Sequence, residues 1–171
     1  MGRSEKRTSP SGMNDALREH VLNLLKARNA HADFDATIRG LDPELQGVRP
    51  EGTAHTAWQL LEHLRIAQWD ILEFSRNADH VSPDWPDDYW PETEASPDDD
   101  AWDRTVESFR SDLDAMCELV RDPATDLLAP FPWADGATVL REALLVADHN
   151  AYHLGQMVML RRLLGAWPSH S

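Results

Sequence analysis

The sequence predicts an all-α protein, a four-helix bundle with long crossover loops. Val, Ile and Thr are sparse, and no segment alternates apolar with polar residues as a half-buried strand does. Four segments instead repeat apolar residues every three or four positions over twenty or more residues, which is typical of helices that bury one face. The connections at residues 42–54 and 78–96 are long for neighbouring antiparallel helices, so we expect one or two crossovers.

The first predicted helix spans about residues 14–40 and the second about residues 56–77. Their apolar residues share one helical face in each segment. Pro43 favours an end to the first helix, and Thr53 or Thr56 is the candidate N-cap of the second. The first stripe contains Leu24, Ala27, His31, Phe34, Ile38 and Leu41, and the second contains Leu60, Leu64, Ala67, Ile71 and Phe74.

The third predicted helix spans about residues 97–121 and the fourth about residues 137–164. Ser96, followed three residues later by Asp99, resembles a capping box at the start of the third helix. Asp135 could cap the start of the fourth. The third stripe contains Trp102, Val106, Phe109, Leu113, Met116 and Val120.

Composition restricts the class of partner. The chain has 171 residues, 42% of them hydrophobic, and we expect one domain over residues 13–167 with tails at 1–12 and 168–171. The net charge of −14 argues against nucleic acid and against an anionic membrane surface as partners. Ten acidic and no basic residues lie between Asn77 and Asp103, so much of this charge belongs to one loop. That loop either packs over an end of the bundle or forms a lid over a site.

The remaining composition favours a soluble, cytoplasmic protein. Cys117 is the single cysteine, so the chain forms no internal disulfide. No apolar run approaches the ~18–20 residues that span a bilayer, and the polar, basic start at residues 1–12 does not read as a secretory signal. Seven tryptophans are a weak indication of a homodimer, because aromatic residues are enriched at interfaces.

Two histidines in the fourth predicted helix carry the strongest functional signal. His149 and His153 are four residues apart, so both imidazoles project from one face and can reach one metal ion. The spacing alone is weak, but the pair lies in the centre of an apolar stripe that should face the core. Imidazoles buried there need partners for their nitrogens. The stripe contains Leu145, His149, His153, Gln156, Leu160 and Leu163.

A third ligand is required for a firm site, because open catalytic metal sites usually have three protein ligands. His63 lies on the flank of the second apolar stripe, a position that looks toward the cleft between helices. His31 lies within the first stripe, where it either lines a pocket or makes a buried hydrogen bond between helices.

The segments at residues 61–70 and 148–156 resemble the DinB/YfiT-like family, which has one histidine in its second helix and two histidines four residues apart in its fourth. Residues 30–34, 87–91 and 141–142 are also similar to one branch of that family. The resemblance covers roughly residues 14–167. It implies a four-helix bundle with a divalent metal, nickel or zinc, bound by His63, His149 and His153. It also implies, for some branches, a thiol-dependent transferase or isomerase activity.

Five further residues are candidates for supporting roles. Gln156, one turn beyond the histidine pair, could orient a metal-bound water or bond a facing backbone group. Glu142, two turns before the pair, could contact substrate, but as an acid near the helix N-terminus it is expected rather to complement the helix dipole. Asp70 and Asp148 flank their stripes, and either could accept the second N–H of a ligating histidine. Tyr152 could line the cleft or pack in the core.

Two functions remain open. The first is a metal-dependent enzyme, a thiol-dependent transferase or a hydrolase, that acts on a small molecule at a three-histidine site, with a low-molecular-weight thiol as a possible cofactor. The second is a non-catalytic, stress-related bundle whose metal is structural. In either case only neutral imidazoles bind a metal, so we expect metal affinity to fall below about pH 6.5.

Overall fold

The computed structural model describes residues 10–27 and 30–168, and within them it is built from helices. Of the tails expected at residues 1–12 and 168–171, residues 1–9 and 169–171 lie outside this part, whereas Pro10–Gly12 belong to the first helix. The helices are α1 (Pro10–Leu25), α2 (Phe34–Ile38), α3 (Pro43–Gln46), α4 (Ala57–Arg76), the short 3₁₀ helix η1 (Asp87–Tyr89), α5 (Ala101–Arg121) and α6 (Val139–Leu163). The described residues contain no strand beyond a single bridge between Pro130 and Thr138. The predicted all-α fold is confirmed.

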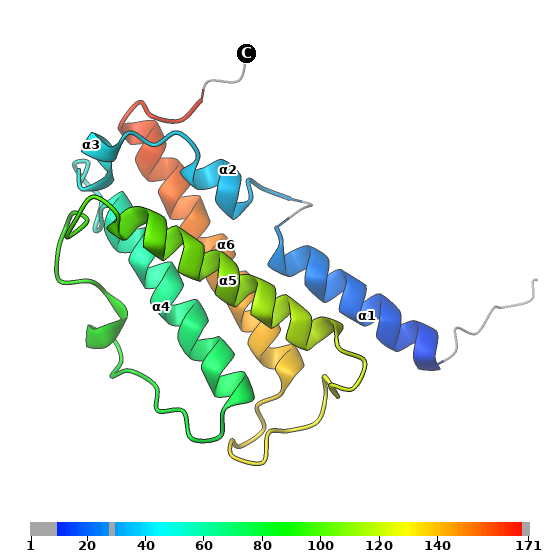
Figure 1. Cartoon of the computed structure of the whole chain (residues 1–171). Helices are drawn as coiled ribbons and strands as arrows, with labels where there is room; N and C mark the ends of the chain where they lie inside the picture. The colour runs from blue at the N-terminus through cyan, green and yellow to red at the C-terminus, as the bar shows by residue number, and fades with distance from the viewer. Residues whose placement is uncertain (1–9, 28–29, 169–171) are drawn as a thin grey trace, which may run out of the picture.

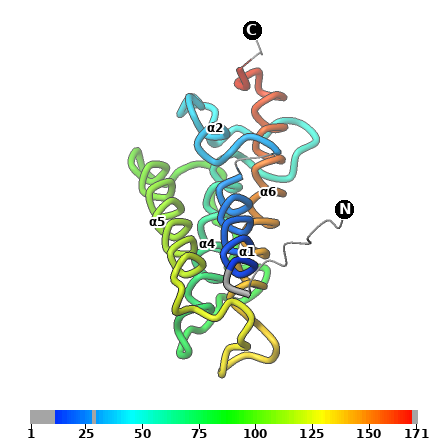
Figure 2. The backbone as a smooth tube through the Cα atoms, turned by 90° about the vertical axis from the view of Figure 1, so that its right-hand side faces the viewer, coloured from blue at the N-terminus to red at the C-terminus, as the bar shows by residue number. Residues whose placement is uncertain are grey.

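Four long helices form the body of the molecule (Figures 1 and 2). The α6 helix packs against α1, α4 and α5, whereas the backbones of α1 and α4 do not come close to each other, so α5 and α6 lie between them. Figure 1 shows the loop after α4 running back along the outside of that helix, so that α4 and α5 begin at the same end. The two helices that carry the candidate metal ligands, α4 and α6, are therefore direct neighbours.

The core is divided into two clusters of buried side chains. One lies among α2, α4, α5 and α6 and includes Phe34, Leu61 and Phe109, the last stacked on Phe34. The other joins α1, α5, the first half of α6 and Leu72 near the end of α4, and it includes Met116 and Val146. The candidate ligands lie alongside the first cluster, on helices that it holds in place.

Local capping sets where the two site helices begin. At the start of α4, the Thr56 hydroxyl accepts from the Gln59 backbone N–H, and the Gln59 side chain accepts from the Thr56 N–H, which makes a capping box. The predicted choice between Thr53 and Thr56 is thereby settled. The start of α6 is capped by Thr138, whose side chain accepts from the Arg141 N–H. Asp135, the predicted cap, lies outside the helix.

The first predicted helix is wrong as one continuous element. The chain leaves α1 after Leu25, and Ala27 adopts a positive φ of 50°, which a helix interior does not allow. A new short helix, α2, begins at Phe34 with Asp33 as its N-cap. The apolar period of the sequence continues across this break, but it does not mark one buried face there, because the side chain of Leu24 is exposed.

The third helix begins later than predicted. Ser96 and Asp99 do not form a capping box, and α5 starts only at Ala101. The carboxylate of Asp98 instead accepts from the backbone N–H of Asp100 and pairs with Arg104, 2.8 Å away. Side chains of this kind compete with the helix for backbone groups, so the acidic run forms turns instead of a first helical turn.

A buried arginine ties the end of α6 to α2. Arg161 is 1% exposed, and its guanidinium donates to the backbone oxygens of Thr37, Arg39 and Ala166. Burial lowers the pKa of Arg161, and the three carbonyl groups supply the polar contacts that the charge loses from water. Among the described helices, none combines the length and the apolar character needed to cross a membrane.

Candidate metal centre

Three imidazoles converge between α4 and α6. The Nε2 atom of His63 lies 3.0 Å from Nε2 of His149 and 3.1 Å from Nε2 of His153. All three ligand atoms lie within 4.8 Å of one another. In a tetrahedral site with metal–nitrogen distances of about 2.0–2.1 Å, the ligand nitrogens are about 3.3 Å apart. The cluster therefore has the spacing needed to hold one metal ion.

In two of these rings, the hydrogen bond made by Nδ1, the nitrogen that faces away from the cluster, shows which nitrogen carries the proton. Nδ1 of His63 lies 2.8 Å from the backbone oxygen of Tyr89, which can only accept, so Nδ1 is protonated and Nε2 presents a lone pair. Nδ1 of His153 likewise donates to Oε1 of Gln156 at 3.0 Å. Two lone pairs 3.1 Å apart cannot hydrogen-bond to each other. This donor set fits a cation that both nitrogens bind.

Burial keeps the three imidazoles neutral. It is the largest cause that lowers the pKa of His63 to about 4, to which His153 and His55 add, against the hydrogen bond to Tyr89. Burial, followed by the nearby His153 and His63, lowers the pKa of His149 to about 3. Burial also lowers the pKa of His153. At neutral pH all three rings are therefore in the form that binds a metal.

The loop after α4 supplies the carbonyl that orients His63. Tyr89 is buried, and its hydroxyl donates to Oδ2 of Asp70 at 2.5 Å. Oδ1 of the same carboxylate lies 2.8 Å from Nε2 of His80. Asp70 therefore does not contact a ligating histidine, contrary to the prediction. It anchors Tyr89, and Tyr89 in turn accepts the proton of His63.

The next residue of this loop covers the site. The indole of Trp90 stacks on His63 with ring centroids 3.8 Å apart and an interplanar angle of 2°. Its other face stacks on His55 at 3.9 Å and 10°. Trp90 is thus enclosed between two imidazoles, and the acidic, aromatic loop forms one wall of the candidate centre.

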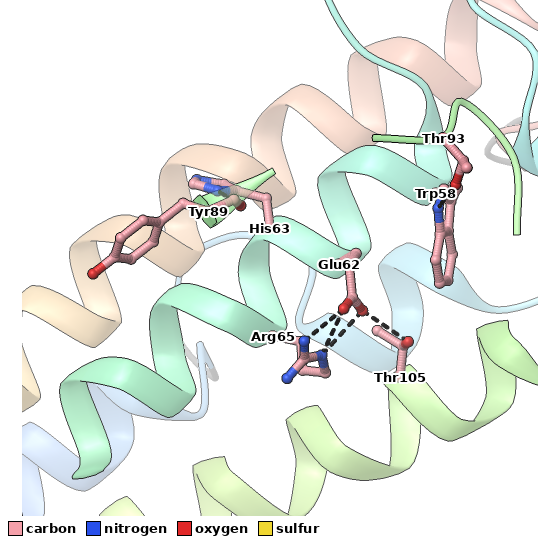
Figure 3. A network of polar contacts seen from close by, with 7 residues as sticks. All are labelled: Trp58, Glu62, His63, Arg65, Tyr89, Thr93 and Thr105. Carbon is pink, nitrogen blue, oxygen red and sulfur yellow. Dashed lines mark hydrogen bonds and ion pairs between the residues drawn. The ribbon is translucent and has the colours of Figure 1, made fainter. Parts of the chain in front are cut away.

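Two further contacts hold the loop against the start of α4. The Trp58 indole N–H donates to Oγ1 of Thr93, and the Thr56 hydroxyl donates to the backbone oxygen of Glu94. Figure 3 shows Trp58 and Thr93 in contact, with His63 and Tyr89 further along the helix. The loop is therefore fastened on both sides of Trp90.

The opposite side of α4 is used for packing. Glu62 points away from His63, toward α5, where its carboxylate accepts from the hydroxyl of Thr105 at 2.9 Å (Figure 3). Arg65 forms an ion pair with the same carboxylate. Arg65 is therefore held on this face of α4 and not at the histidine cluster.

Three of the predicted supporting residues lie on α6 but away from the Nε2 atoms. Glu142 is buried near the start of the helix and pairs with Arg141, two turns from His149. Asp148 is exposed and makes no hydrogen bond to a histidine. Tyr152 is 64% exposed, and its ring meets the edge of His153 with centroids 4.8 Å apart.

The predicted core stripe of α6 needs a correction. Leu145 and Leu163 are 39% and 58% exposed, so the stripe lies at the border between core and solvent. His31 is exposed as well, and its Nδ1 contacts the backbone oxygen of Ala32. It borders a cavity among α1, α2, α5 and α6 that is lined by none of the three clustered histidines. Because the first helix is broken, His31 does not occupy the buried position predicted for it.

Sequence reasoning missed three residues at this site. His55, which directly precedes the N-cap of α4, meets the cluster through Trp90. Asn150 donates to Oε1 of Gln68 at 2.8 Å, and Gln68 donates to the backbone oxygen of Phe109 at 2.7 Å. This chain of hydrogen bonds crosses from α6 through α4 to α5 beside His149. The one indication of these hydrogen bonds in the sequence was the presence of polar residues within apolar helical segments.

The fold and the cluster together define a helical-bundle protein with a candidate three-histidine metal centre. A model of the DinB superfamily matches residues 26–157, which include all three histidines and most of the bundle. The chain belongs to the DinB superfamily, as its resemblance predicted. No curated protein and no solved structure matches the chain.

Proposed function

We propose that this protein binds a divalent metal ion, nickel or zinc, through Nε2 of His63, His149 and His153. We further propose that it is a metal-dependent enzyme, a thiol-dependent transferase or a hydrolase, acting on a small molecule. The observation that carries the proposal is the pair of lone pairs on His63 and His153, which face each other at 3.1 Å. Neutral imidazoles without a carboxylate favour such borderline metals over magnesium or calcium.

The residues around the cluster suit an open site. When bound, the ion would supply a Lewis acid that lowers the pKa of a water or thiol at its remaining position. Tyr89 and Gln156 hold the protons of His63 and His153 on their outer nitrogens. Trp90 excludes water from one face of His63. Among the described residues, no carboxylate or thiolate joins the three histidines as a fourth ligand.

The second candidate is a structural metal in a non-catalytic, stress-related bundle. It is favoured by the burial of His63, which is 1% exposed beneath Trp90. A structural ion should leave no position for an external ligand, whereas a catalytic ion should exchange one. Adding imidazole or cyanide to cobalt-loaded protein separates the two, because only an open position changes the visible absorption of cobalt.

The first experiment is elemental analysis of protein purified without added metal and then loaded with zinc or nickel. The wild type should hold one equivalent, and His63→Ala, His149→Ala and His153→Ala should each lose most of it. His20→Ala, an exposed histidine on α1, is the matched control. Full metal content in all three variants would overturn the site. The predicted homodimer remains a prediction, for which light scattering is the measurement.

A further inference from the structure

A small cavity lies beside the histidine cluster, at the start of α4 and the second half of α6. Its volume is about 200 Å³. Its walls include His55, Leu60, Gln156, Met159 and Leu160. Gln156 is one hydrogen bond from His153, and His55 reaches His63 through Trp90. None of the three histidines lines the cavity, but its residues contact His153 directly and His63 through Trp90.

The cavity walls carry no formal charge. Ala54, Leu60, Met159 and Leu160 make most of the surface apolar, and no Asp, Glu, Lys or Arg lines it. Burial, followed by the charge of Arg49, lowers the pKa of His55, so that its ring is neutral at pH 7. A charged molecule that entered would lose water without gaining an opposite charge, which is costly.

Two polar groups in the cavity have hydrogen-bonding capacity to spare. Oε1 of Gln156 accepts from His153, which leaves its amide N–H groups for another partner. Within the described chain, the ring nitrogens of His55 make no hydrogen bond, because its contact with Trp90 uses the ring face. Together they offer at least one donor and one acceptor to a bound molecule.

We propose that this cavity is the substrate pocket of the candidate centre and that it takes a small, uncharged molecule with an apolar body and one polar group, which His55 and Gln156 bind. This inference rests on the proposed function and adds its substrate class. The pocket is smaller than the ~300–1,000 Å³ sites of drug-sized ligands. The volume and the uncharged walls favour such a molecule over a large, charged peptide thiol.

A cavity among α1, α2, α5 and α6 differs from this pocket in the charge of its walls. Its volume is about 270 Å³, and it is lined by charged residues, including Lys26, Asp35 and Arg110. Asp35 and Arg110 already form an ion pair with each other, 2.7 Å apart. None of the clustered histidines lines either cavity; the charged one meets the site at Asn150, beside His149, and not at His55 or Gln156, the residues that contact Trp90 and His153.

The test uses three four-carbon probes that differ in charge: 1-butanol, butyrate and butylammonium. Each is titrated into the full chain, metal-free and zinc-loaded, while the methyl NMR signals of Leu60 and Leu160 are followed. Butanol should shift both signals in a saturable way, and the two charged probes should bind at least about tenfold more weakly. Equal binding of all three, or no shift with any of them, would overturn the pocket.

Two variants test the residues that line the cavity. His55→Phe keeps a ring to stack on Trp90 but removes the nitrogens, and it should weaken butanol binding several-fold. Met159→Lys should move the preference toward butyrate, whereas Leu163→Lys, an exposed position further along α6, should not. Identical probe binding by wild type and both cavity variants would contradict the assignment.

The pocket and the metal can fail separately. Elemental analysis reports the metal and methyl NMR reports the cavity. Zinc bound without selective butanol binding refutes the pocket alone. If the protein takes up neither zinc nor nickel in the elemental analysis but still binds butanol selectively, the metal centre is refuted and the cavity remains a binding site for a small, uncharged molecule.

Discussion

The stability of the metal-free protein should fall steeply as the pH drops below 6.5, because the buried histidines resist protonation. His63 and His149 have pKa values of about 4 and about 3 in the folded state, against 6.5 for an ordinary histidine. Below pH 6.5 the unfolded chain therefore binds protons that the folded chain does not. The free energy of unfolding is then highest above pH 6.5 and decreases as the pH falls toward 4.

The magnitude follows from the width of this window. Between pH 6.5 and pH 5 each imidazole is mostly protonated in the unfolded state and neutral in the folded state. At 1.36 kcal/mol per pH unit, each one costs about 2 kcal/mol at pH 5. His63 and His149 together should remove about 4 kcal/mol of stability between pH 7.5 and pH 5. That is a large part of the ~5–15 kcal/mol typical of a domain.

The assay is urea unfolding, followed by circular dichroism at several pH values. The double variant His63→Gln/His149→Gln should lose about 4 kcal/mol less than the wild type between pH 7.5 and pH 5, since glutamine does not titrate. His20→Gln, with its exposed side chain, is the control that should behave as the wild type. Parallel stability curves for the double variant and the wild type would refute the reasoning.

Three more substitutions test the surroundings of the centre. Gln156→Leu removes the acceptor for His153 and should weaken zinc binding about 10–100-fold in a chelator competition without unfolding the chain; unchanged affinity would contradict the role of Gln156. Trp90→Leu uncovers His63, so an NMR titration of that imidazole should give a pKa closer to 6.5 than the value of about 4. Arg161→Met leaves buried carbonyl groups without a donor and should lower the free energy of unfolding by about 3 kcal/mol, whereas a loss below 1 kcal/mol would show that these contacts are dispensable.

The three clustered histidines could be predicted because each lies at a regular position in a long helix. The spacing of His149 and His153 places them on one face of α6, and His63 projects from the flank of its stripe toward the same space. Helical periodicity gives directions of this kind reliably over several turns. The match to the DinB superfamily covers these same helices.

The contacts between the loop after α4 and His63 could not be predicted, because no local sequence pattern indicates which helix a loop residue will pack against. Tyr89 and Trp90 reach His63 from 26 and 27 residues further along the chain, so their contacts depend on the whole path of the loop. The pairing of Asp70 with Tyr89 was hidden for the same reason. The position of Asp70 beside the apolar stripe suggested a direct contact with a ligating histidine, but Tyr89 of the loop lies between Asp70 and His63.

The expected pH range of metal binding also changes with burial. From the ordinary pKa of histidine, the sequence predicted that metal affinity falls below about pH 6.5. In the folded chain, the lowered pKa values of His63 and His149 move the competition between protons and metal toward pH 4. The identity of the three histidines could be predicted from the sequence, whereas their pKa values depend on Trp90 and the core, which exclude water.

Because Trp90 stacks between His55 and His63, the candidate metal ligands and the groups that set the environment of His63 belong to different parts of the chain. The ligands sit on rigid helices whose packing tolerates little change, while the groups that set the polarity and orientation of His63 sit on a loop. If the three histidines bind a metal as proposed, substitutions or length changes in that loop would alter its affinity without moving a ligand. A bundle built in this way could change the properties of its site through one connecting segment.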